Sequence, residues 1–188
     1  MLKKLIAPAL VYCLFLNTTN ANAQVEMQVF GSIYPQQIKQ YSEECLSLLN
    51  IQNQIRVNIF ITDHLPYPYE GRTVRHAPDS AGIDQYSVYV QSGLKSEKQF
   101  LILAHELIHV KQYAAGLLDV TGDDVLWHGK RYYLHPDQLY SMPWENEAYA
   151  DDDGLAKKFF TIRKQAQKEI REMAAINKKT SDARHSGR

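Results

Sequence analysis

The segment from Ser96 to Ala115 constrains the fold of this chain most strongly, because its apolar residues nearly encircle a helix. Ser96-Glu97-Lys98-Gln99 has the form of a capping box, which begins helices, and Gly116 is the residue type that commonly ends them. The apolar positions are Leu101, Leu103, Ala104, Leu107, Ile108, Val110 and Ala114. A helix that is apolar on all sides is buried. Other elements must therefore cover it from several directions.

Three polar residues interrupt this apolar helix in the arrangement H-E-x-x-H: His105, Glu106 and His109. A spacing of four places both imidazoles on one face, one turn apart, where they can bind one metal ion. Glu106 lies about 100° around the helix from His105, close enough to reach a metal-bound water without being a ligand. Burying these side chains without partners would cost several kcal/mol. We therefore expect a zinc site on this helix.

A catalytic zinc needs a third protein ligand and an open fourth position. The Gly and His that follow this motif in metzincins are absent after His109. A later segment, Asn146-Glu147-Ala148-Tyr149-Ala150-Asp151, offers carboxylates at Glu147 and Asp151, one helical turn apart. Glu145 is a rival ligand, but it lies roughly 200° from Glu147 around a helix and lacks an acidic residue four positions later.

The two motifs together, His105-Glu106-x-x-His109 and Asn146-Glu147-x-x-x-Asp151, resemble the active site of gluzincins, the thermolysin-like group of zinc metallopeptidases. The resemblance covers about 47 residues and implies a small version of the two-helix core with a short sheet. It also implies that Glu147 is the third zinc ligand and that Asn146 and Asp151 orient the histidines. We expect Asp152 and Asp153 on a hydrated helix face, although the acidic run could also bind a cation such as calcium.

The expected chemistry is hydrolysis of a peptide bond by a metal-activated water. Zinc lowers the pKa of its water towards about 7 and polarises the carbonyl, and Glu106 takes the proton and returns it to the leaving amine. Gluzincin-like sites also use a Tyr or His to stabilise the oxyanion. The residues near the two motifs that could do so are His128, His135, Tyr132, Tyr133, Tyr140 and Tyr149. We favour His128, because the turn Trp127-His128-Gly129 could carry it over the site.

The rest of the sequence predicts an α+β, zincin-like domain: a short β-sheet, the buried zinc-binding helix and a C-terminal helix that bears the glutamate. Alternating apolar residues predict strands at Gln54–Thr62 and Ile83–Val90, and we expect substrate to align beside the second as an edge strand. Helical spacing predicts a helix at Pro35–Asn50, with Cys45 in the core, and another from Pro143 past Gly154. We expect a loop at Asp63–Ser80 and a hairpin within Trp127–Leu134.

The first 23 residues have the regions of a secretory signal peptide. Lys3 and Lys4 precede the apolar stretch Leu5 to Leu16, and Ala21-Asn22-Ala23 is the small-x-small pattern of a cleavage site. The mature chain would begin at Gln24 and be secreted or periplasmic; an uncleaved amphipathic anchor is the alternative. Without Cys13, Cys45 is the one cysteine left, which excludes an intramolecular disulfide.

Charge is balanced overall but unevenly distributed. The chain has 21 basic and 21 acidic side chains, so we expect no nucleic-acid partner. Residues 155–188 hold 10 basic and 3 acidic side chains, whereas residues 24–154 hold 9 and 18. We expect a catalytic domain over residues 24–177 and a disordered basic tail over 178–188. The tail could contact anionic envelope polymers or lipid headgroups, or be no more than a solvated surface.

The sequence thus predicts an exported zinc-dependent peptidase that acts on a polypeptide or on the peptide part of an envelope polymer. Two alternatives remain open. One is a zinc-stabilised envelope-binding module without turnover, against which an intact Glu106 argues, since a structural zinc site needs no base. The other is a nonpeptidic zinc hydrolase.

Overall fold

The computed structural model describes residues 25–66, 68–133 and 141–185 of the chain. In these residues it confirms the expected α+β class, with three helices and two β-sheets. The elements are β1 (Val25–Phe30), α2 (Pro35–Leu48), β2 (Ile55–Thr62), β3 (Gly71–His76), β4 (Asp84–Gln91), α3 (Ser96–Ala114), β5 (Leu118–Thr121), β6 (Asp124–Trp127), β7 (Lys130–Tyr133) and α4 (Pro143–His185). The predicted signal peptide, residues 1–23, lies outside the described residues.

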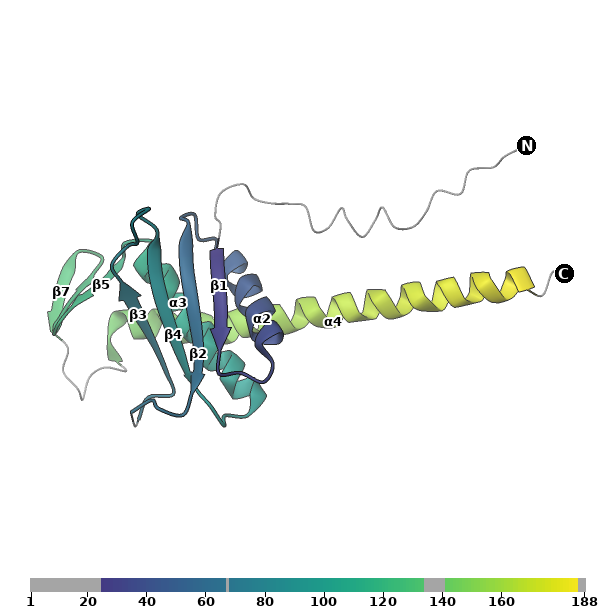
Figure 1. Ribbon diagram of the computed structural model, residues 1–188, viewed down its shortest axis with the longest axis horizontal. Helices are drawn as coiled ribbons and strands as arrows, with labels where there is room; N and C mark the ends of the chain where they lie inside the picture. Colours follow the sequence, from purple (N-terminus) through teal and green to yellow (C-terminus); the bar gives the residue numbers. More distant parts are fainter. Residues whose placement is uncertain (1–24, 67, 134–140, 186–188) are drawn as a thin grey trace.

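The larger sheet has the strand order β1-β2-β4-β3 (Figure 1). β1, β2 and β4 are parallel, and β3 runs antiparallel to β4 at the edge. The predicted strands at β2 and β4 are confirmed, because alternate side chains of each are fully buried against the helices. These side chains are Ile55, Val57, Ile59, Tyr86, Val88 and Val90. β1 was not predicted, although Val25, Met27 and Val29 alternate with polar residues.

The edge strand is not the one that we expected. β4, which contains most of Ile83–Val90, lies inside the sheet between β2 and β3. The edge is formed by β3, within the segment Asp63–Ser80 that we expected to be a loop. β3 lacks an apolar alternation because its inward residues Gly71 and Thr73 face the polar side chain of Glu106 on α3. The expected edge position of Ile83–Val90 and the expected loop throughout Asp63–Ser80 were therefore wrong, whereas Ile83–Val90 is a strand as predicted.

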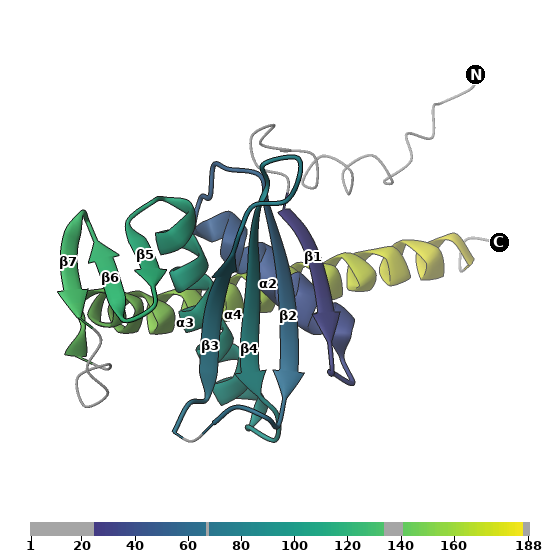
Figure 2. The same ribbon diagram turned by 60° about the vertical axis from the view of Figure 1, so that its left-hand side comes forward.

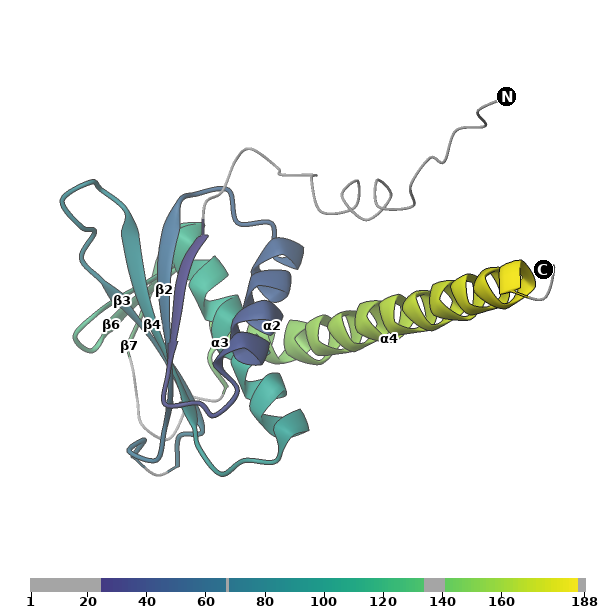
Figure 3. The same ribbon diagram turned by 45° about the vertical axis from the view of Figure 1, so that its right-hand side comes forward.

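All three helices lie on one side of the larger sheet (Figure 3). α2 packs on β1, α3 packs on β3 and β4, and α4 crosses both α3 and α2. The helices meet at Tyr41 of α2, whose ring lies 4.6 Å from Phe100 of α3 and 4.3 Å from Phe159 of α4. The Tyr41 hydroxyl also donates to the carbonyl of Phe100 at 2.8 Å. Cys45 is fully buried nearby in α2, as expected.

α3 is buried as predicted, with every residue from Leu103 to Val110 inaccessible or nearly so. Gly116, at a φ of 68°, follows the end of the helix as expected. The predicted capping box does not form, because Ser96 is already the first helical residue and Lys95, at the N-cap, makes no side-chain cap. The helix that carries His105, Glu106 and His109 is therefore enclosed in the core.

The smaller sheet, β5-β6-β7, lies next to β3 and the start of α4 (Figure 2). It includes the predicted hairpin, whose last residue, Leu134, lies outside the described residues. α4 begins at Pro143 and continues past Gly154 as predicted, but it also remains helical through residues 178–185, which we expected to be disordered. Its later part projects beyond the rest of the molecule (Figure 1). In the described part of the chain, no helix combines the length and apolar character needed to cross a membrane.

Candidate metal site

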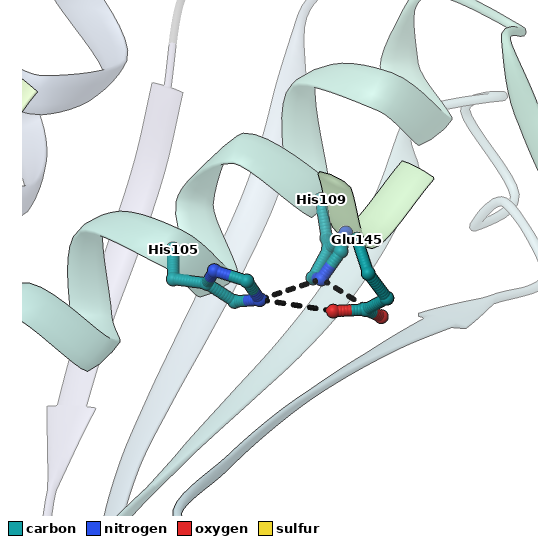
Figure 4. Close-up of side chains that lie close together, drawn as sticks. All are labelled: His105, His109 and Glu145. Atoms are coloured by element: carbon teal, nitrogen blue, oxygen red, sulfur yellow. Dashed lines mark hydrogen bonds and ion pairs between the residues drawn. The ribbon is translucent and has the colours of Figure 1, made fainter. Parts of the chain in front are cut away.

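Three potential metal-binding side chains converge in the interior: His105 and His109 from α3 and Glu145 from α4 (Figure 4). The two Nε2 atoms are 3.2 Å apart. Oε2 of Glu145 is 3.2 Å from Nε2 of His105, and its Oε1 is 3.4 Å from Nε2 of His109. Ligand atoms about 2.0–2.1 Å from a tetrahedral zinc ion are separated by about 3.3–3.4 Å. The three side chains therefore fit a tetrahedral metal ion.

The carboxylate beside the histidines belongs to Glu145, not to Glu147 as the sequence motif suggested. The buried face of α4 explains the difference. Ala148, Asp152 and Phe159 define this face, and at about 100° per residue Glu145 lies close to it whereas Glu147 points well away. The predicted third ligand, Glu147, was therefore wrong. The rival Glu145, two residues earlier, is the carboxylate that faces α3.

His105 is oriented by a carboxylate on α4. Its Nδ1 lies 3.2 Å from Oδ2 of Asp152, which is buried. An ionised Asp152 can only accept, so Nδ1 carries a proton and Nε2 is the atom that faces Glu145. Asp152 lies seven residues after Glu145, two turns along the same face. We had assigned Asp152 to a hydrated surface, and this assignment was wrong.

His109 is oriented by Gln112, from its own helix. Nε2 of Gln112 donates to the carbonyl of Trp144 at 3.0 Å, which turns its Oε1 toward Nδ1 of His109 at 2.8 Å. The Nδ1 atom of His109 therefore carries a proton, and its Nε2 also points into the site, toward Glu145. Gln112 is fully buried. Both imidazoles thus turn Nε2 toward the same point, where loss of the Nε2 proton would leave an electron pair for a metal ion.

Asn146 and Asp151, which we expected to orient the histidines, do not reach them. Asn146 is exposed and donates to the carbonyl of Ser141 at 3.3 Å, and Asp151 is exposed on the outer face of α4. Instead, Asp152 contacts His105 and Gln112 contacts His109. The second motif that carried the resemblance to gluzincins therefore does not lie at the site as a unit.

Glu145 and His109 are electrostatically paired in the site. Burial tends to raise the pKa of Glu145, but hydrogen bonds with His105 and His109 outweigh it and lower this pKa to about 2. Burial likewise opposes protonation of His109, yet its hydrogen bond with Glu145 and the charge of Glu106 raise its pKa to about 9. Glu145 is thus an anion held against two imidazoles. The proton on His109 balances this charge, and a metal ion bound at the same point would replace that proton.

Glu106 lies beside the three ligands and is itself buried, with 5% of its surface exposed. Burial raises the pKa of its carboxyl above the usual value, and the neighbouring His109 and His105 partly oppose the shift. Its Oε2 accepts a hydrogen bond of 2.7 Å from the hydroxyl of Thr73 on β3. A carboxylate with a raised pKa at the edge of a metal site has the properties of a general base.

The site opens into a cavity of about 420 Å³ between β3, α3, β5 and the start of α4. His105, Glu106, His109 and Glu145 all line it. Its rim includes three exposed apolar side chains, which are Tyr69, Val120 and Tyr149. The cavity therefore combines a polar centre with an apolar margin, as ligand sites commonly do.

His128 does not line the cavity, so the structure does not support it as a catalytic residue. It forms the tight turn between β6 and β7 with Gly129, and both have positive φ, as a type I′ turn requires. Its ring packs on Trp127.

The other candidates for the oxyanion donor differ in position. Tyr132 packs on Trp144, Tyr133 is exposed, and His135 and Tyr140 lie outside the described residues. Tyr149 lines the cavity, and its ring centroid is 4.5 Å from that of His105. Tyr149 is thus the sequence-predicted candidate that borders the metal ligands.

The residues brought together can hold one cation, leave part of its surroundings open to a cavity and place a buried carboxylate next to it. The sequence predicted His105, Glu106 and His109 in this arrangement, and the structure adds Glu145, Asp152, Gln112 and Thr73. Comparisons with protein-family models, with curated proteins and with solved structures find no match to this chain.

Proposed function

We propose that this protein is an exported zinc-dependent peptidase that hydrolyses peptide bonds in polypeptide or envelope-peptide substrates. The observation that carries the proposal is the triangle of His105, His109 and Glu145, with buried Glu106 beside it at an open cavity. Two histidines and a glutamate form the ligand set of thermolysin-like zinc peptidases. The proposed likeness to gluzincins therefore rests on the residue types of the three ligands. It does not rest on the spacing of Asn146, Glu147 and Asp151.

When bound, zinc would act as a Lewis acid on a carbonyl oxygen and would increase the acidity of water at the site. The chain itself supplies the groups that move protons. Glu106 accepts a proton from water in the cavity and delivers it to the departing amine. Tyr149, which lines the cavity with its ring 4.5 Å from that of His105, is our candidate for the donor to the developing oxyanion.

The open edge of β3 offers a place for the substrate backbone. Residues of an antiparallel pair alternate between those that bond across the pair and those that turn outward. The amide of Gln91 donates to the carbonyl of Glu70 at 2.8 Å, so the outward positions are Gly71 and Thr73. An extended peptide could pair there directly above Glu106. We propose β3, and not Ile83–Val90, as the strand that aligns the substrate.

The location and the tail remain parts of the proposal. The signal peptide in residues 1–23 supports export to a periplasm or to the medium. The basic excess in residues 155–188 supports contact with anionic envelope material. These features would bring the cavity to envelope or extracellular polypeptides, and they give no reason to expect a nucleic-acid partner.

The test is to measure metal content and hydrolysis of fluorescently labelled casein with the chain from Gln24 onward and with its Glu106→Gln variant. We expect one zinc ion per chain in both proteins and turnover in the unsubstituted chain alone. Turnover by Glu106→Gln would exclude Glu106 as the base. Zinc without turnover in either protein, including on muropeptides, would favour the binding module, and absence of zinc would refute the proposal.

A further inference from the structure

The carboxylate of the general-base candidate Glu106 is buried but accepts few hydrogen bonds. Among the residues that the structure describes, Thr73 is the one hydrogen-bond donor to its carboxylate, at 2.7 Å from Oε2. The neighbouring wall is the backbone of Gly71. A Cβ atom at this glycine would lie 2.4 Å from Oε1 of Glu106 and 2.7 Å from Cγ2 of Ile102. The carboxylate therefore fits into a space that only a glycine leaves open.

Both contacts come from the same short stretch of the edge strand. Gly71 and Thr73 are two residues apart, so their side-chain positions lie on one face of β3, toward α3. Their backbone groups point to the open edge, where we propose that the substrate pairs. Thr73 thus touches the base with its side chain and presents its backbone to the substrate.

The Thr73 hydroxyl can keep this contact through a proton transfer. Its oxygen is also 2.9 Å from the backbone carbonyl oxygen of Glu106, which is a second acceptor. The single hydroxyl proton can point to the ionised carboxylate, or to this carbonyl while the hydroxyl oxygen accepts from a protonated carboxyl. A valine side chain of similar shape can do neither. The carboxyl group of Glu106 therefore has a partner in the same place with or without its proton.

We propose that Thr73 is a positioning residue that holds the Glu106 carboxyl group from the strand on which the substrate pairs. This inference rests on the proposed function. Because one residue joins the base to the substrate-binding edge, a shift of β3 would move both together. Removing the hydroxyl should then reduce the rate of the chemical step and leave substrate affinity largely intact, since the backbone of Thr73 remains.

The test compares Thr73→Val, Thr73→Ser and the exposed control Thr121→Val on β5. A casein cleavage site is first mapped by mass spectrometry and converted into an internally quenched peptide, which yields kcat and KM. We expect Thr73→Val to lower kcat by about 10–100-fold, the usual effect of losing an orienting partner, with KM and zinc content little changed. Thr73→Ser and Thr121→Val should stay close to the unsubstituted protein.

Two results would overturn the inference while leaving the peptidase proposal intact. One is an unchanged kcat in Thr73→Val, and the other is a loss in Thr73→Ser as large as in Thr73→Val. A loss of zinc in Thr73→Val would also refute positioning of Glu106, since the effect would then act through the metal.

A second measurement does not depend on turnover. The losses in free energy of unfolding of metal-free Thr73→Val, Glu106→Leu and the double variant should be non-additive if the two side chains interact, because leucine has no acceptor for the hydroxyl. Additive effects would refute the hydrogen bond itself. An unsubstituted chain that cleaves no substrate, or a fully active Glu106→Gln variant, would instead refute the proposed function.

Discussion

The two helices that supply the candidate metal ligands differ in how completely they are buried. α3 is enclosed between the sheet, α2 and α4, so that every residue from Leu103 to Val110 is buried. The first turns of α4 are buried on one face only, through Ala148, Asp152, Leu155, Ala156 and Phe159, while the other residues from Tyr149 to Lys158 face solvent. A polar residue in this part of α3 lies inside the protein whichever way it points around the helix. On α4, a shift of two residues moves a side chain from the site to the surface.

This difference identifies the observation that matters for each helix. On α3, the spacing of His105 and His109 is sufficient to bring them together, because both directions around the helix lead to the interior. On α4, the ligand has to be found from the apolar stripe. Most predictions below compare a substitution on the inner face of α4 with a matched substitution on its outer face. The last one tests whether the outer face is exposed.

The largest expected effect is the loss of metal in Glu145→Gln. This change removes the anion that lies 3.2 Å from His105 and 3.4 Å from His109, so two neutral imidazoles remain. Stoichiometric zinc binding should be abolished, as measured by elemental analysis after dialysis. The matched control Glu147→Gln should keep one zinc per chain. A loss of zinc in Glu147→Gln with retention in Glu145→Gln would restore the original sequence prediction.

The next effect concerns stability. Phe159→Ala should destabilise the protein by about 3–5 kcal/mol, because this fully buried ring packs edge-on against Tyr41. Phe160→Ala should cost much less, since Phe160 is 42% exposed. Urea unfolding of the metal-free proteins measures both. Equal losses would mean that α4 is covered on both faces, and the contrast with α3 would then fail.

The sequence was most informative where local spacing alone determines the arrangement. The buried helix, the strands β2 and β4 and the pair of histidines all follow from periodicity within one segment. β3 could not be recognised in this way, because its inward residues Gly71 and Thr73 are selected by contact with Glu106 rather than by an apolar core. Its composition is therefore that of a loop.

The third ligand was missed for a different reason, although a signal was present. The stripe of Leu155 and Phe159, continued backward at steps of three and four, passes through Asp152, Ala148 and Glu145. The spacing of the gluzincin motif selected Glu147 instead. Asp152 and Gln112 could not be assigned from the sequence, since their roles depend on how α4 crosses α3.

A smaller effect is expected from Asp152→Ala. The Nδ1 atom of His105 would lose the carboxylate at 3.2 Å that fixes its tautomer, and zinc affinity should fall by about 10–100-fold. Competition with a chromophoric chelator measures this change. Asp151→Ala, one residue earlier on the exposed face, should leave the affinity unaltered. If both variants bind zinc as tightly as the unsubstituted protein, Asp152 has no role in orienting His105.

The smallest effect tests the exposed face of α4 directly. Gly154 lies on this face, and a Cβ atom added there would meet nothing within 4 Å. Gly154→Ala should therefore stabilise the protein by about 0.5–1 kcal/mol in urea unfolding, because alanine loses less conformational freedom in a helix. Ala150→Gly, at another exposed position, should lower stability by a similar amount. Destabilisation by Gly154→Ala would show that this face is in contact with another part of the protein, and α4 would then be enclosed as α3 is.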